Sequence, residues 1–203
     1  MTAEEIYNQL KEKFAEGILE FDGEALEPTV KVDAKKLFEI ASHLKNEAKL
    51  NFDSLMCLSG IDYGAENNLG VIYSLTSIKF KHKITIRVDL PRENPEIDSV
   101  ESLWRTADWH EREAYDLFGI RFNNHPDLRR ILCPDDWEGF PLRKDYIVQE
   151  YYHGTRVPYQ EDWMKYETYH KNPERGNHVF QFEKKVPNIP ANGAGKIETK
   201  KEG

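Results

Sequence analysis

Apolar residues at the beginning of the chain recur every four positions, which is typical of one face of an amphipathic helix. The apolar stripe of this first predicted helix consists of Ile6, Leu10 and Phe14. Thr2 and Glu5 form a capping box at its start, and Gly17 ends it. A second helix is predicted from Asp33, which caps it, to about Lys49, because apolar residues again recur there at helical spacing.

Five shorter apolar runs predict strands over 18–21, 29–32, 52–61, 69–78 and 83–90. In the last run Ile84, Ile86 and Val88 alternate with Thr85 and Arg87, and this period of two suits a strand with one buried face. The connections at 64–68 and 79–82 are short enough for antiparallel hairpins. The order α-β-β-α-β-β-β predicts a two-layer α+β domain, followed by short helices and a long irregular C-terminal arm.

The stretch after the predicted sheet carries two further signals for the start of a helix. Asp98 with Glu101 predicts one short helix, and Asp108 with Glu111 predicts another over about 109–118, which Gly119 ends. Prolines and glycines then interrupt every regular period. We therefore divide the chain into an α+β domain (1–107), a signature segment (108–146) that we expect to form an interface, an extended arm (147–186) and a flexible tail (187–203).

The signature segment alternates fixed charges with large aromatic residues, a composition that protein interfaces favour. Arg112 and Asp116 lie four residues apart and share one face of the predicted helix. Glu111 and Glu113 do not face one another, so they make a poor acid/base pair. His110 and Glu113 lack a second histidine one turn further on, so the metal-binding pattern of two histidines on one helix is absent. The segment is therefore predicted to bind another protein.

Composition and charge exclude several classes of function. The chain has 203 residues, a net charge of −8 and a pI of about 5.4, so its surface as a whole does not attract nucleic acid or an anionic membrane. No apolar run approaches the roughly 20 residues that span a bilayer, and no signal peptide is recognisable, so we expect a cytoplasmic protein. Cys57 and Cys133 are too far apart for a Cys-x-x-Cys pattern, and Cys57 is expected to be a buried thiol.

Three blocks of the signature segment resemble the C-type subunit of respiratory complex I, the proton-translocating NADH:quinone oxidoreductase. The blocks are HEREAYDLFG at 110–119, HPDLRRIL at 125–132 and EGFPLRKDY at 138–146. Residues 1–107 resemble the family through the order of their predicted elements only. The fold that the resemblance implies agrees with the predicted α+β domain.

The resemblance also implies a cofactor-free structural subunit, which is a non-catalytic part of the translocating enzyme. Such a subunit holds the quinone-reducing D-type subunit next to the subunits with the terminal iron–sulfur clusters. FMN, iron–sulfur clusters, NADH and quinone would belong to the rest of the complex, which lies at the cytoplasmic face of the bacterial inner membrane. Neither nucleic acid binding nor direct membrane insertion is expected. The residues implied at the interface are Glu111, Arg112, Glu113, Asp116, His125, Arg129, Arg130, Arg143, Lys144 and Asp145.

Two other interpretations stay open at this point. Equivalent subunits occur in energy-converting hydrogenases and in complexes fed by ferredoxin or a reduced deazaflavin, although the three intact blocks favour the respiratory form. A free-standing hydrolase or metal enzyme is disfavoured, because the sequence lacks the Gly-x-Ser-x-Gly pattern, nucleotide-binding glycine loops and metal-ligand spacings.

Overall fold

The computed structural model describes residues 1–64 and 68–157, and Met1–Val157 form one compact unit. The boundaries expected at residues 107 and 146 both fall inside this unit. The arm expected over 147–186 is described only as far as residue 157, and the tail expected over 187–203 lies outside the described residues.

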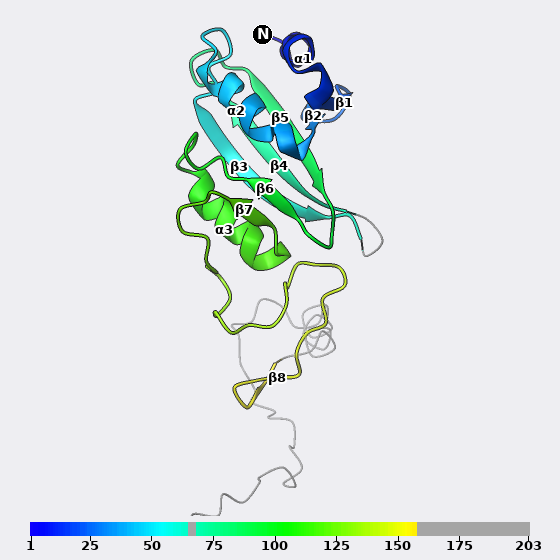
Figure 1. Cartoon of the computed structure of the whole chain (residues 1–203), viewed down its shortest axis with the longest axis vertical. Helices are drawn as coiled ribbons and strands as arrows, with labels where there is room; N and C mark the ends of the chain where they lie inside the picture. The colour runs from blue at the N-terminus through cyan, green and yellow to red at the C-terminus, as the bar shows by residue number, and fades with distance from the viewer. Residues whose placement is uncertain (65–67, 158–203) are drawn as a thin grey trace, which may run out of the picture. The chain divides into compact units, whose positions relative to one another are not determined.

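Helices and strands alternate along the described residues (Figure 1). In chain order the elements are α1 (Ala3–Lys13), the 3-10 helix η1 (Ala15–Gly17), β1 (Ile18–Asp22), β2 (Thr29–Val32), the 3-10 helix η2 (Ala34–Lys36), α2 (Leu37–Asn46), β3 (Ser54–Asp62), β4 (Leu69–Thr76), β5 (Lys83–Leu90), β6 (Glu96–Asp98), α3 (Ala107–Phe118), β7 (Arg121–Asn123), β8 (Tyr151–Tyr152) and β9 (Thr155–Arg156).

Five of these strands form one sheet in the order β1-β2-β5-β4-β3. All neighbours are antiparallel except β2 and β5, which run parallel, and α2 lies in the crossover between them. The predicted α+β class and the two predicted hairpins, β3–β4 and β4–β5, are confirmed.

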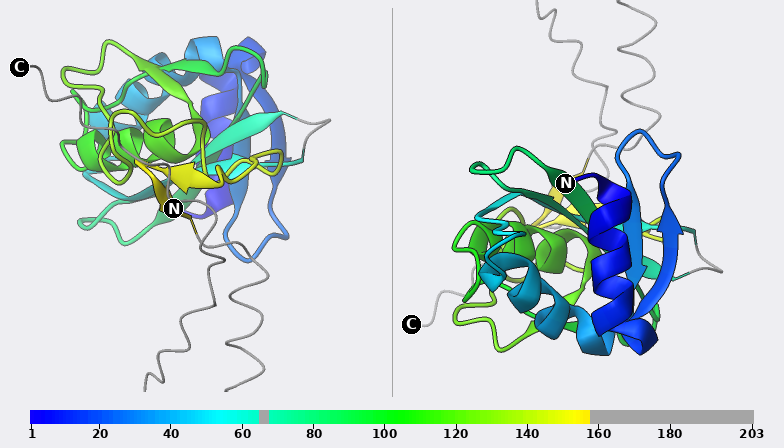
Figure 2. Two further views of the ribbon diagram at one scale, coloured as in Figure 1. Left: turned by 90° about the horizontal axis from the view of Figure 1, so that it is seen from below. Right: turned by 90° about the horizontal axis from the view of Figure 1, so that it is seen from above.

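The helices α2 and α3 cover one face of the sheet (Figure 1 and Figure 2). Ile40 of α2 lines a small apolar cavity together with Tyr73 of β4. Phe118 of α3 packs so closely on β3 that a Cβ atom on Gly60 would lie 2.5 Å from its ring. Side chains of the opposite face, such as Ile72, stay partly exposed. The core therefore lies between one sheet face and the helices.

The start of α1 follows the sequence prediction. The Thr2 hydroxyl accepts the Glu5 N–H at 3.2 Å, and the Glu5 carboxylate accepts the Thr2 N–H at 3.0 Å. The start of the second helix differs, because Asp33 accepts the N–H of Lys35 at 2.7 Å and caps the 3-10 helix η2. The α-helix proper begins only at Leu37.

The helix predicted from Asp98 and Glu101 does not form. Its first residues instead belong to β6, which pairs in parallel with β7 and is followed by a turn. The cause is a contact from α3, because the Glu111 carboxylate accepts the Ser99 hydroxyl at 2.6 Å and the Val100 N–H at 2.8 Å. This tertiary contact takes the backbone donor that a new helix would have left free.

The capping box predicted at the start of α3 is also wrong. The helix begins at Ala107 with Thr106 at the N-cap position, and no side chain caps it. Glu111 is directed into the core instead. The predicted end is confirmed, because Gly119 has φ +72° and forms the left-handed C-cap.

The prediction for Cys57 is wrong as well, since this thiol is exposed. The register of β3 against β4 shifts between Leu55 and Cys57. Leu55 and Leu58 consequently face the core, while Met56 and Cys57 are left on the outside.

Candidate functional site

The signature segment folds around α3, and Gly119 sets its first turn. A Cβ atom at Gly119 would lie 2.5 Å from the ring of Phe140, and the positive φ of this residue strains any other side chain. Phe140 also receives the guanidinium of Arg143, whose central carbon lies 4.7 Å from the ring centroid. The Arg143 Nε donates to the carbonyl of Phe118 at 2.6 Å. The end of the signature segment is thereby packed against the end of α3.

A buried carboxylate, Asp116, organises the loop that follows β7. Its Oδ2 accepts the backbone N–H groups of Ile131, Leu132 and Cys133 at 3.0, 2.7 and 2.8 Å. Its Oδ1 lies 2.8 Å from Arg130 Nη1. We call Asp116, Arg130 and the backbone of 131–133 the Asp116 cluster.

Arg130 extends the Asp116 cluster further along the chain. Its Nη2 donates to the carbonyls of Trp137 and Gly139 at 3.0 and 3.1 Å. Burial by itself raises the pKa of Asp116, but the three backbone donors and Arg130 outweigh it and hold that pKa below its usual value. The carboxylate therefore stays ionised, and the loop from 130 to 139 is fixed by the side chain of one helical residue.

A second buried carboxylate, Asp62 at the end of β3, joins the signature segment to the sheet. Its Oδ2 accepts the N–H of Lys144 at 2.7 Å, and its Oδ1 accepts the N–H of Gly64 at 2.8 Å. Arg92 Nη2 pairs with Asp62 Oδ1, and Arg92 Nη1 lies 3.1 Å from Asp145 Oδ1. We call Asp62, Arg92, Lys144 and Asp145 the Asp62 cluster.

A third buried carboxylate, Glu111, has no close cationic partner among the described residues. It is fully buried, and burial raises its pKa to about 7 despite the hydrogen bonds from Ser99 and Val100. Glu101 and Asp108 raise this pKa further through charge repulsion. Glu111 is thus the one carboxyl in the described part of the chain whose pKa is raised to near neutrality.

The imidazole of His125 lies beside this carboxylate. Its Nδ1 accepts the N–H of Asp127 at 3.0 Å, which assigns the ring proton to Nε2. Nε2 faces the Asp108 carbonyl at 3.3 Å, Asp108 Oδ1 at 3.4 Å and Glu111 Oε2 at 3.9 Å. The turn after β6, the start of α3 and the loop after β7 therefore meet at one buried polar group of residues.

The structure divides the ten residues predicted for the interface into two groups. Glu111, Arg112, Asp116 and His125 have buried side chains with partners in this chain. Arg130 and Arg143 are partly buried, whereas Glu113, Arg129, Lys144 and Asp145 are exposed. A role of these residues in contacts with another protein stays a prediction.

Two residues that sequence reasoning missed are Asp62 and Arg92. Asp62 lies 82 positions from Lys144 along the chain, and Arg92 lies 53 positions from Asp145. No local period or motif connects such distant residues, so no signal in the single sequence pointed to them.

Several exposed apolar side chains lie along the signature segment and just after it. Ile147 is 88% exposed, and Trp109, Leu132, Leu142 and Tyr151 are each more than half exposed. The backbone that carries them is held by the Asp116 and Asp62 clusters. An ordered backbone with exposed apolar side chains is suited to contact with another protein.

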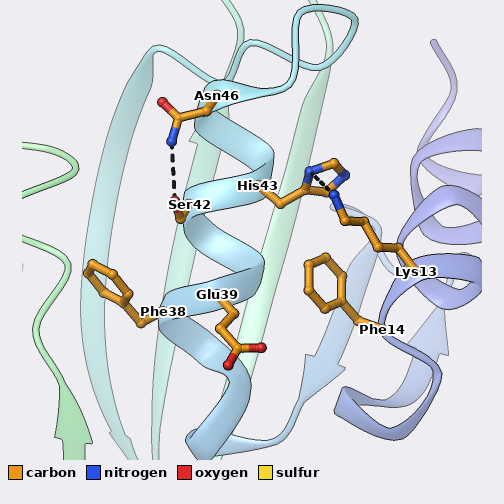
Figure 3. A pocket seen from close by; sticks show the side chains of 7 residues that line it. All are labelled: Lys13, Phe14, Phe38, Glu39, Ser42, His43 and Asn46. Carbon is orange, nitrogen blue, oxygen red and sulfur yellow. Dashed lines mark hydrogen bonds between the residues drawn. The ribbon is translucent and has the colours of Figure 1, made fainter.

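A shallow groove of about 440 Å³ lies elsewhere, between the end of α1 and the outer side of α2 (Figure 3). The Lys13 Nζ lies 3.1 Å from His43 Nδ1, and Phe14 packs edge-on against the same imidazole. Burial and the neighbouring Lys13 lower the pKa of His43. These groups contact one another and belong to neither cluster, so we assign the groove no function.

Within residues 1–64 and 68–157, no three His, Cys, Asp or Glu side chains are grouped so that they can hold a metal ion. In the same part of the chain, no helix has both the length and the apolar character needed to cross a membrane.

The fold and the site together define a two-layer α+β protein with a long surface segment fixed to it by buried ion pairs. Residues 30–152 match the model of the 30-kDa subunit of the respiratory-chain NADH dehydrogenase, and the chain belongs to this family. The resemblance recognised in the three sequence blocks is therefore confirmed.

Two bacterial relatives bear the name of the C-type subunit of NADH-quinone oxidoreductase. The protein of Chloroherpeton thalassium is 50% identical over 155 residues, which are 75% of this chain and 64% of the relative. The protein of Chlorobium phaeobacteroides is 48% identical over 155 residues, which are 75% of this chain and 93% of the relative. The chain thus spans slightly less than two thirds of the first relative and nearly all of the second.

Two solved structures are similar to this fold. The trypsin-resistant fragment (1–134) of Nqo5 is 30% identical with a TM-score of 0.53, and the match covers 61% of this chain and 98% of the fragment. A chain of the membrane-bound sulfane sulfur reductase, an archaeal respiratory membrane complex, is 18% identical with a TM-score of 0.61 and covers 89% of this chain and 96% of its own. The second likeness shows the fold alone.

Proposed function

We propose that this chain is the C-type subunit of an NADH-quinone oxidoreductase and that it forms part of the peripheral arm of that complex as a docking protein. The relatives that are about half identical carry this name. The observation that supports docking is the row of exposed apolar residues on a fixed backbone, from Trp109 to Tyr151.

The signature segment is suited to docking because its ordering does not wait for the partner. Association costs free energy when loops and side chains become ordered at the interface. The Asp116 and Asp62 clusters already hold this backbone within the chain. Exposed side chains such as Ile147 and Leu142 then meet the partner from defined positions.

The occupant that we propose is the quinone-reducing subunit together with its neighbouring iron–sulfur subunits. In this proposal the chain holds no cofactor, and FMN, iron–sulfur clusters, NADH and quinone are bound by the rest of the complex. The complex would lie at the cytoplasmic face of the bacterial inner membrane. The chain would support electron transfer and proton translocation by its position and without a catalytic residue of its own.

The other interpretations receive less support. The likeness to the archaeal sulfur-reducing complex is at 18% identity and carries no information on the electron donor. Relatives named for NADH and quinone are 48–50% identical. A complex fed by NADH is therefore the better-supported proposal.

Capture of the complex by the tagged full chain tests this proposal. The chain is expressed in its own host, and it is purified from mildly solubilised membranes. The expected partners bind flavin and iron–sulfur clusters and show NADH:quinone activity. A tagged chain that is folded but brings none of these proteins along would refute the proposal.

Two matched variants locate the docking surface. Ile147→Asp places a charge in the proposed interface, and we expect at least about 30-fold weaker capture, since a central apolar contact is worth roughly 2 kcal/mol or more. Leu26→Asp changes another fully exposed aliphatic residue, in the loop between β1 and β2, and should capture the complex normally. Equal capture by both variants would show that the strip at Ile147 is not part of the interface.

A further inference from the structure

The Asp62 cluster connects three parts of the chain that are far apart in sequence. Asp62 ends β3, Arg92 follows β5, and Lys144 and Asp145 belong to the end of the signature segment. We infer that Asp62 and Arg92 are positioning residues that hold the docking backbone against the sheet before any partner binds. This inference rests on the proposed docking function and names the residues that prepare the surface for it.

The burial of the cluster supports this role. The side chain of Asp62 is 1% exposed and that of Arg92 is 12% exposed. Both oxygens of Asp62 accept backbone donors, from Gly64 on one side and from Lys144 on the other. Burial alone raises the pKa of Asp62, but these two donors and Arg92 outweigh it and lower the pKa below its usual value. The carboxylate is therefore ionised at neutral pH and keeps its full strength as an acceptor.

Arg92 joins the cluster to the backbone on both of its sides. Its Nη2 donates to the carbonyl of Gly64 at 2.6 Å and also reaches Asp62. Its Nη1 donates to Asp145 at 3.1 Å. A guanidinium has a planar fork of donors, whereas an ammonium group is a point charge. Arg92→Lys is therefore expected to retain the charge and to lose the connection.

The position of the cluster decides what it controls. Ile147 lies two residues after Asp145, and Leu142 lies two residues before Lys144. On the other side of the cluster, the Leu142 N–H donates to the carbonyl of Leu117 at 3.1 Å. The exposed apolar side chains thus begin where the backbone is held. If the cluster opens, only a fraction of the molecules present these side chains correctly, and the apparent Kd for the partner rises in proportion.

Hydrogen exchange on the full chain tests the inference without any partner. Asp62→Asn keeps the shape of the side chain but leaves one acceptor oxygen in place of two. A hydrogen bond to a charged group has a strength that corresponds to about a 10- to 100-fold change in an opening equilibrium. We expect the protection of the Lys144 amide to fall by this factor in Asp62→Asn and in Arg92→Lys. The amides of β4 and β5 should keep their protection, because local opening leaves the sheet intact.

Arg87→Lys is the matched control. Arg87 forms a comparable pair with Asp89 on the opposite face of the sheet, with Nε–Oδ1 at 2.9 Å and Nη2–Oδ2 at 3.2 Å. This variant should leave the Lys144 amide as protected as it is in the wild type. Equal loss of protection at Lys144 and throughout β4 in the Asp62 variant would overturn the inference, since the cluster would then serve general stability. Unchanged protection at Lys144 would overturn it too.

Capture of the complex separates this inference from the proposed function. If the wild-type chain captures no NADH-oxidising partners, the proposed function fails. If the wild type captures them and the Asp62→Asn chain captures them equally well despite a loosened Lys144 amide, the inference alone is overturned. The expected result is capture weakened about as much as the Lys144 amide is deprotected, because both measurements follow the same opening equilibrium.

Discussion

Replacing the buried carboxyl of Glu111 by an amide should change how the stability of the chain depends on pH. Glu111→Gln has nearly the same shape, and its carbonyl oxygen can accept the Val100 N–H. Its amide group can donate to the Ser99 hydroxyl, which accepts as well as donates. The substitution therefore removes the titration and keeps the two contacts that hold the turn after β6.

The expected magnitude follows from the pKa of Glu111. This carboxyl has an ordinary pKa of 4.5 in the unfolded chain and a pKa of about 7 in the folded chain. The folded state binds the proton more tightly, so the free energy of unfolding falls as the pH rises from about 4.5 to about 7. Above pH 7 the ionised carboxylate lowers stability by roughly 3 kcal/mol relative to the protonated form.

The assay is urea denaturation of the wild type and the variant between pH 5 and pH 8.5. The variant should be more stable than the wild type by roughly 3 kcal/mol at pH 8, and most of this difference should disappear at pH 5. Asp62, Asp89 and Asp116 have lowered pKa values, so their contribution to stability is lost only as the pH falls through the acid range. Their effect cancels in the difference between the two proteins.

Glu113→Gln on the same helix is the control, because this side chain is exposed. It should leave the pH dependence of stability unchanged. Parallel stability curves for wild type and Glu111→Gln from pH 5 to pH 8.5 would refute the reasoning, since they would mean that Glu111 ionises in the folded chain as easily as in water.

Three further substitutions test the signature segment, with a fourth at its surface. Asp116→Ala removes the acceptor of three backbone donors and leaves a buried arginine without its carboxylate, which should lower the free energy of unfolding by about 3–5 kcal/mol in urea denaturation. Gly119→Ala should cost at least about 1 kcal/mol in the same assay, because φ is +72° and the new methyl group would meet the ring of Phe140. Arg112→Ala should destabilise the isolated chain, since this side chain is buried against Trp109. Arg129→Ala should leave the denaturation midpoint unchanged and reduce only capture of the complex, and a shifted midpoint would contradict its assignment to the surface.

The sequence by itself determined those features that depend on near neighbours. The alternation of apolar and polar residues placed β5 at Lys83–Leu90 with both ends correct, because strand geometry repeats every two residues. The capping box of Thr2 and the end of α3 at Gly119 were predicted for the same reason, since each depends on contacts within a few residues. The three signature blocks also identified the family, because each is a continuous run of residues that is recognisable without its tertiary contacts.

Only the tertiary structure decided which charges are inside. Glu111 and Glu113 are two residues apart and chemically identical, yet the first is fully buried and the second is exposed. Their neighbours in sequence do not distinguish them, because a buried charge depends on the donors that reach it from other elements. The same reason explains the missing helix at Asp98, and it explains why Asp62, 82 positions from Lys144, went unnoticed. Long-range donors and acceptors are brought together only when the sheet and α3 have packed.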